Sequence, residues 1–184
     1  MSFVTRLLKE LASFVVLAVV IVLPIRLFVA QPFIVEGASM VPTFDDGQYL
    51  IVDELTYRFA EPKRDDVIIF RYPVDPSFFF IKRIIGLPGE TVRISEGAVS
   101  IQKPGEEPFT LEESYISSKD AAYSLTRKLG DDEYFVMGDN RPKSSDSRIW
   151  GALPRANITG RAFVRLLPLD KIGILPGAVV PETK

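Results

Sequence analysis

A serine and a lysine are the residues of this chain best suited to nucleophilic catalysis. The 184-residue chain contains neither histidine nor cysteine. A nucleophile must therefore be a hydroxyl, and its base must be a group other than imidazole. Ser39 lies in residues 37–43, Gly-Ala-Ser-Met-Val-Pro-Thr, and Lys82 lies in residues 80–86, Phe-Ile-Lys-Arg-Ile-Ile-Gly. This pair predicts a hydroxyl nucleophile served by an amine base.

The neighbours of Ser39 favour a role in chemistry over an ordinary solvated hydroxyl. Gly37 and Ala38 are small enough for the backbone to approach a substrate closely, and Pro42 fixes a turn just afterwards. Such a turn can present a hydroxyl beside free backbone N–H groups, which an oxyanion hole requires.

Lys82 can act as a base only when it is neutral. At its ordinary pKa near 10.4, about one lysine in a few thousand is neutral at pH 7, but burial lowers that pKa. If residues 78–85 form a strand, Phe80, Lys82 and Ile84 share one face. The alternative, with Arg83 facing the core and Lys82 facing water, fits the periodicity equally well.

A polar cluster at residues 138–148, Gly-Asp-Asn-Arg-Pro-Lys-Ser-Ser-Asp-Ser-Arg, supplies many hydrogen-bonding side chains. Alone it would be read as a polar surface loop with Asx-type turns. Beside Ser39 and Lys82 it predicts a supporting layer. Ser144 could orient the lysine amine, while Asp146 and Arg148 could pin the loop by a charge-assisted pair.

The N-terminal segment is apolar over a length that fits a membrane. The run 11–25 is interrupted only by Ser13 and Pro24, and its apolar neighbours extend it to the roughly 20 residues that a bilayer needs. A cleavable secretory signal is one alternative, but Phe28 stands where a small residue would be needed before Ala30. A buried core helix is the other, although such runs usually have only about 10–14 apolar residues. We expect one uncleaved transmembrane helix over 7–30.

Charge predicts the orientation of this anchor. Arg6 and Lys9 precede the run, whereas Arg26 is the one charge on its far side. The positive-inside bias places the short N-terminal stretch 1–6 in the cytoplasm and the chain after about residue 30 outside.

The remainder reads as a mainly β domain over 31–172, with a coiled, barrel-like sheet. Short runs rich in β-branched and aromatic residues alternate with Gly, Pro and Asp. The predicted strands are 48–52, 66–72, 78–85, 91–94, 98–102, 133–137 and 160–167. Residues 95–132 are more polar and are interpreted as an insertion or flap, and 173–184 as a loosely held tail.

Composition excludes several classes of function. The formal net charge is −2, so a nucleic-acid partner is not expected. A chain without His or Cys lacks the usual ligands of zinc or non-haem iron, so no metal and no cofactor is expected.

Four segments together closely resemble bacterial type I signal peptidase, a membrane-bound serine protease, and the resemblance extends from the anchor to about residue 172. Residues 39–43 match the family's nucleophile box, and 64–70 resemble its next structural box, with Asp65 where Gly is common. Residues 82–90 match the lysine box, with Glu90 for the usual Asp, and 138–148 match the last box. Relatives from eukaryotes and archaea use histidine instead of lysine, so this chain resembles the bacterial kind.

The resemblance implies roles for the candidate site residues. Ser39 would be the nucleophile and Lys82 the general base. Ser144 would help to position Lys82, and Asp146 with Arg148 would hold the site together.

One position departs from part of the family. Gly37 stands where some relatives carry a Ser whose hydroxyl donates to the oxyanion. The oxyanion hole is therefore expected to rely on the backbone N–H of Ser39, joined by another nearby N–H.

The resemblance also implies a substrate, the signal peptides of exported preproteins, cut after small residues in an Ala-X-Ala pattern. An extended peptide could add as a strand beside 33–37 and near 78–82. We expect bulky side chains to form shallow pockets there, although each could instead belong to the core. These residues are Phe33, Val35, Met40, Phe44, Phe80 and Ile81. Trp150 is expected either at the bilayer surface or in the core.

The implied location is the bacterial cytoplasmic membrane, with the catalytic domain on its outer side and with membrane lipid and the export machinery as partners. Two other functions compete with this one. The first is a self-cleaving Ser-Lys protease of the repressor type, which is soluble and carries a DNA-binding domain. The second is a membrane-tethered β-domain that binds peptides without catalysis.

Overall fold

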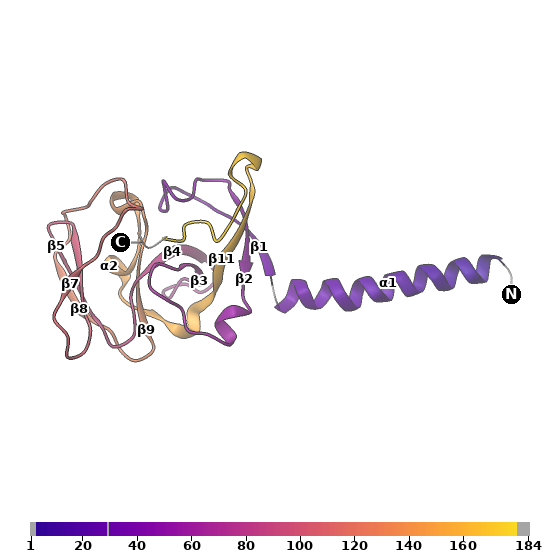
Figure 1. The fold of residues 1–184 in the computed structure, drawn as a ribbon, viewed down its shortest axis with the longest axis horizontal. Helices are drawn as coiled ribbons and strands as arrows, with labels where there is room; N and C mark the ends of the chain where they lie inside the picture. Colours follow the sequence, from indigo (N-terminus) through magenta and orange to yellow (C-terminus); the bar gives the residue numbers. More distant parts are fainter. Residues whose placement is uncertain (1–2, 29, 180–184) are drawn as a thin grey trace, which may run out of the picture.

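The computed structural model describes residues 3–28 and 30–179, and describes side chains for 6–20 and 31–179. A single long helix, α1 (Phe3–Phe28), projects from a β-rich body (Figure 1). In the described part of the chain, no helix is both long enough and apolar enough to cross a membrane. The predicted anchor, 7–30, coincides with α1, but its residue 29 and the side chains of 21–30 lie outside the described part.

Within the described residues, the larger sheet of the body has eight strands, in the order β1-β2-β11-β3-β4-β9-β10, with β12 paired to β11. Each pairing in this sheet is antiparallel. The strands are β1 (Ala30–Ile34), β2 (Tyr49–Asp53), β3 (Val67–Arg71), β4 (Phe79–Gly86), β9 (Glu133–Met137), β10 (Leu153–Pro154), β11 (Ile158–Leu167) and β12 (Gly173–Ile174).

A smaller sheet of four strands, in the order β7-β6-β5-β8, lies at the end of the body away from α1 (Figure 1). Its strands are β5 (Thr91–Ser95), β6 (Ala98–Gln102), β7 (Phe109–Thr110) and β8 (Leu125–Lys128). Beyond the sheets, the described part has one short helix, α2 (Ser147–Trp150), and single 3-10 turns at Thr56–Arg58, Arg141–Lys143, Arg155–Asn157 and Leu169–Lys171.

The structure confirms the mainly β class, and each of the seven predicted strands is present within two residues of its expected bounds. The predicted polar insertion, 95–132, contains β6, β7 and β8 and so forms most of the smaller sheet. The segment is more polar in sequence because only one face of this sheet is buried, through side chains such as Val99 and Ile101.

Strand β9 joins the two sheets through the alternation of its side chains. Tyr134 and Val136 pack into a core cluster with Ile68, Phe70 and Ile84 of the larger sheet. Phe135 and Met137 point the other way, into the core of the smaller sheet. The chain that follows β9, residues 138–148, therefore starts from a strand anchored on both faces.

Residues 173–179, the described part of the expected tail, make specific contacts with the body. Strand β12 pairs with β11, Pro176 is buried, and the Gly177 carbonyl oxygen accepts a hydrogen bond of 2.6 Å from Arg83 Nη1. The two prolines suggested a free end, but the segment instead satisfies a buried guanidinium. Residues 180–184 lie outside the described part.

Gly160 of β11 lies against the backbone of its neighbouring strand β2, and this close approach predicts the effect of an added methyl group. A Cβ there would clash with the Asp53 carbonyl oxygen and lie 2.8 Å from Val52 Cγ1. We expect Gly160→Ala to lower the free energy of unfolding by about 1–3 kcal/mol, because a backbone oxygen cannot move aside cheaply. Urea titration followed by the fluorescence of the single tryptophan, Trp150, measures this.

The matched control is Gly173→Ala, where the nearest atom to an added Cβ is 4.0 Å away. Equal midpoints for the two variants would contradict the proposed steric cause.

Candidate active site

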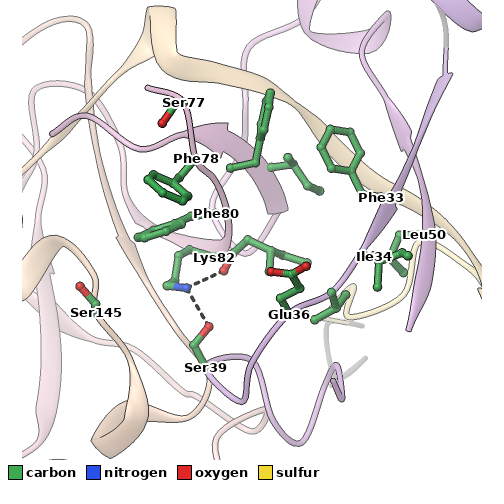
Figure 2. Close-up of a pocket in the computed structure, with 14 residues that line it drawn as sticks. Phe33, Ile34, Glu36, Ser39, Leu50, Ser77, Phe78, Phe80, Lys82 and Ser145 are labelled. Atoms are coloured by element: carbon green, nitrogen blue, oxygen red, sulfur yellow. Dashed lines mark hydrogen bonds between the residues drawn. The ribbon is translucent and has the colours of Figure 1, made fainter. Parts of the chain in front are cut away.

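Ser39 and Lys82 meet beside β4 of the larger sheet. Lys82 Nζ lies 2.7 Å from Ser39 Oγ and 2.8 Å from the Ile81 carbonyl oxygen (Figure 2). Ser39 lies on the turn that follows β1, and Lys82 lies on β4. The fold therefore brings together two side chains that are 43 residues apart in sequence.

The Lys82 amine is buried from solvent. The residue is 4% exposed, and its Nζ lies 5.3 Å from the centre of the Phe80 ring. Burial lowers the pKa of Lys82 to about 8, while the negative charges of Asp146 and Asp139 act to raise it. Because desolvation disfavours the ammonium, a much larger fraction of this lysine is neutral near pH 8 than of a solvated one.

The periodicity of β4 left open which of its two basic residues would be buried, and the structure buries both. Arg83 is fully buried and forms a bidentate pair with Asp139, through Nε to Oδ1 at 2.9 Å and Nη2 to Oδ2 at 2.6 Å. Thr43, four residues after Ser39, also donates a hydrogen bond to Asp139. The consecutive residues Lys82 and Arg83 thus lie on opposite faces of β4. Lys82 contacts Ser39, and Arg83 contacts Asp139.

Hydrogen bonds to main-chain carbonyl groups hold the Ser39 turn. Asn140 Nδ2 donates to the Ala38 oxygen at 2.9 Å, and Asn140 N donates to the Ser39 oxygen at 3.0 Å. Gly37 has a φ of +83°, which favours glycine, and its N–H donates to Asp46 Oδ1 at 2.7 Å. In a planar trans peptide the C=O and N–H point in opposite directions, so the Ser39 N–H points away from Asn140.

Asp146 and Arg148 lie together within the loop 138–148. Asp146 Oδ1 accepts from Arg148 Nε at 2.8 Å, and Asp146 Oδ2 accepts from Arg148 Nη2 at 2.9 Å. The same carboxylate accepts a hydrogen bond of 3.1 Å from Gly138 N. The pair is buried and closes the loop on itself, because it ties residue 148 to the end of β9.

Ser144 lies near the Ser39 backbone and forms no hydrogen bond with the Lys82 amine. Its Oγ is buried and has no hydrogen-bond partner in the described part of the chain. A side chain at Gly138 would clash with Ser144 Oγ and with the Ser39 carbonyl oxygen, so both atoms lie close to the position that a Cβ would take. The hydroxyl is thus next to the Ser39 backbone rather than bonded to Lys82.

An apolar groove of about 460 Å³ opens at Ser39 and Lys82, between β1 and β4 (Figure 2). Of the predicted wall residues, Phe33, Val35, Phe80 and Ile81 line it. Met40 and Phe44 do not line it, which corrects the prediction. They are 1% and 0% exposed and belong to the core beneath the Ser39 turn, because that turn directs them inward.

Trp150 is partly buried against the core, which is one of its two expected positions. It packs against the cluster of the larger sheet, with its ring 5.9 Å from the rings of both Phe70 and Tyr72.

Sequence reasoning missed several functional contacts. The Arg83–Asp139 pair and the two hydrogen bonds of Asn140 were not predicted, although these residues lie in the segments 82–90 and 138–148 that predicted the site. Asp139 and Asn140 directly precede a positively charged residue in a loop rich in polar side chains. That richness was the available signal, but it did not show which partner each side chain would take.

A serine hydroxyl next to a buried amine, at the end of an apolar groove on a mainly β body, is the arrangement of a serine peptidase. The family model described as signal peptidase, peptidase S26, matches residues 8–167. The chain therefore belongs to the signal peptidase family and is a hydrolase of the serine peptidase class.

Two curated relatives agree with this placement. The chain is 40% identical to a probable signal peptidase I-2 of Synechocystis sp. (strain PCC 6803), over 90% of this chain and 76% of the relative. It is 43% identical to a signal peptidase I of Leptolyngbya laminosa, over 86% and 79% of the two chains. A solved signal peptidase I of Enterococcus faecalis V583 is 31% identical, covers 55% of this chain and 97% of its own, and has a TM-score of 0.47.

The burial of Lys82 predicts a directly measurable titration. We expect its amine to titrate near pH 8, because desolvation outweighs the two carboxylates. NMR of protein labelled at the lysine side chains measures the titration, and the signal absent from a Lys82→Met variant assigns it. A Lys82 signal that titrates near 10.5 would contradict the desolvated setting.

Proposed function

We propose that this protein is a membrane-anchored endopeptidase that cleaves signal peptides from exported preproteins after small residues, with Ser39 as nucleophile and neutral Lys82 as general base. The observation that carries the proposal is the 2.7 Å contact between Ser39 Oγ and the amine of a lysine that is 4% exposed. Family membership supports the substrate class.

The chemistry requires Lys82 to accept a proton and return it. In the neutral state the Ser39 hydroxyl donates its hydrogen bond to Nζ, and Oγ attacks the scissile carbonyl carbon as the proton moves to the amine. Collapse of the tetrahedral adduct breaks the C–N bond, and the ammonium protonates the leaving amine. A water molecule then attacks the acyl-enzyme while Lys82 accepts its proton, and the C–O bond to Ser39 breaks as the ammonium returns that proton to Oγ.

Attack turns the oxygen of the scissile carbonyl group into an oxyanion, which needs a hydrogen-bond donor close to it. We assign the Ser39 N–H, which points away from Asn140 because the Ala38 carbonyl group points toward it. Gly37 cannot supply a second donor through its own N–H while that group is bonded to Asp46.

The groove explains how an extended peptide would be held. Strand β9 pairs with β4 through residues 83–86 but not along 79–82. Backbone groups on that half of β4 can therefore pair with a substrate strand. Phe33 and Phe79 meet edge to face at 5.2 Å across the groove, and such bulky walls leave room for small substrate side chains.

The anchor is proposed from the apolar character of α1. Exposed apolar side chains occupy consecutive positions from Phe14 to Leu17, so they surround the helix instead of forming one stripe. A helix that is apolar all round suits a lipid environment. With Arg6 and Lys9 at its start, the N-terminus would face the cytoplasm and the β-rich body the outer side of the membrane.

Replacement of either dyad residue tests the function. We expect Ser39→Ala, Lys82→Ala and Lys82→Arg each to lose about a thousandfold or more in cleavage rate, since arginine cannot act as a base. Full-length protein in detergent and lipid is incubated with a preprotein that carries an Ala-X-Ala site, and the new N-terminus is sequenced. The matched control is Lys143→Ala, an exposed lysine of the neighbouring loop, which should retain wild-type activity.

The outcomes separate the competing functions. No cleavage by folded wild-type protein would favour a tethered peptide-binding domain. Cleavage confined to the protein's own chain would favour the self-cleaving type. Substantial activity in Lys82→Arg would refute the general-base role.

The pH dependence provides an independent prediction. Only neutral Lys82 can accept the proton, and its pKa is lowered to about 8. We therefore expect kcat/KM to rise about tenfold per pH unit below pH 8 and to level off above it. Initial rates measured between pH 6 and 10 on one peptide substrate test this, and a profile that is flat from pH 6 to 8 would contradict it.

A further inference from the structure

A segment between β7 and β8, residues 113–123, lies over three buried arginines, and we call it the cover segment. The side chains of Arg83, Arg141 and Arg148 are 0%, 2% and 1% exposed. Glu113 pairs with Arg141, with Oε2 accepting from Nη1 at 3.1 Å. The ring of Tyr115 lies 4.0 Å from the guanidinium carbon of Arg83.

The other end of the cover segment holds the third arginine. Asp120 Oδ2 accepts a hydrogen bond of 2.9 Å from Arg148 Nη1, and the Tyr123 ring lies 4.7 Å from the guanidinium carbon of Arg148. A buried guanidinium is stable only when it is paired, and an aromatic face adds further attraction. The cover segment therefore supplies partners that these arginines need.

Two of these arginines also hold the loop 138–148 from within. Arg141 Nε donates to the Gly138 carbonyl oxygen at 3.1 Å, and Arg148 Nη2 donates to the Arg141 carbonyl oxygen at 2.6 Å. Asn140 directly precedes Arg141, and its two hydrogen bonds hold the carbonyl groups of Ala38 and Ser39. A continuous series of contacts thus runs from Glu113 and Asp120, through the arginines, to the serine turn.

We propose that the cover segment positions the nucleophile, with Glu113 and Asp120 as positioning residues for the reaction. Their carboxylates fix Arg141 and Arg148, which fix the loop so that Asn140 keeps Ser39 Oγ within reach of Lys82. The proposal rests on the proposed roles of Ser39 and Lys82. Neither carboxylate lines the apolar groove, so the effect should fall on turnover and not on peptide binding.

The test uses Glu113→Gln and Asp120→Asn in the full-length protein, with kcat and KM measured on one peptide substrate. We expect kcat to fall about tenfold or more and KM to stay within about twofold, because small displacements of a reacting group are costly. Glu112→Gln removes a neighbouring exposed carboxylate and should match wild type. Asp120→Glu retains the charge and should recover most of the lost kcat.

A double-mutant cycle separates positioning from a general loss of stability. If Glu113 acts through the loop, the effects of Glu113→Gln and Asn140→Ala on kcat should be clearly non-additive. Active-site titration gives the folded, competent fraction of each variant. Asp120 is the more exposed of the two carboxylates, at 16%, so Asp120→Asn keeps the test decisive if Glu113→Gln does not fold.

Wild-type kcat in both variants would overturn the proposal. So would additive effects in the cycle, or losses of kcat that vanish when rates are corrected for the competent fraction. Absence of cleavage by the wild-type protein would instead refute the proposed function, and the two failures are therefore distinguishable.

Discussion

The balance of charge around one buried amine is the constraint on which the rest of the site depends. In its proposed role Lys82 must lose its proton readily, yet Asp139 and Asp146 both act to keep it charged. Each carboxylate is neutralised by a bidentate arginine, Arg83 for Asp139 and Arg148 for Asp146. The arginines weaken the field of the carboxylates at Nζ, so burial decides the protonation state of the lysine.

Each of these arginines has more N–H donors than its carboxylate can accept. The remaining N–H groups bond to other segments and so determine which segments pack around the site. Arg83 donates to the carbonyl groups of Asp65 and Gly177, from two distant parts of the chain. Arg148 donates to the Arg141 carbonyl group and to Asp120. A buried guanidinium needs hydrogen-bond acceptors for its N–H groups. The C-terminal segment and the cover segment supply acceptors and therefore pack against the body.

Much of the site could be predicted from sequence, because a chain without histidine or cysteine leaves few nucleophile–base pairs, and short β-rich runs mark the strands. The burial of both Lys82 and Arg83 could not be predicted. Alternation assigns the two residues to opposite faces of β4, but it does not show that both faces are covered. The partners of Asn140 and Glu113 also escaped prediction. They are 102 and 28 residues away, and only the packed sheets bring them together. Met40 and Phe44 were misplaced because an apolar residue beside a nucleophile can face either the groove or the core.

The manner in which Ser39 is held suits the nucleophile role that is proposed for it. A residue within a strand ladder commits its N–H to a neighbouring strand, whereas an oxyanion hole needs that N–H for the substrate. The Ser39 turn is instead held through its carbonyl oxygens, by Asn140 of the loop 138–148. That loop is fixed in turn by β9, whose side chains enter both cores, and by the arginines beneath. Rigid elements thus position a turn that is not part of a strand ladder. The position of Ser39 is fixed accurately while its N–H stays available to the substrate.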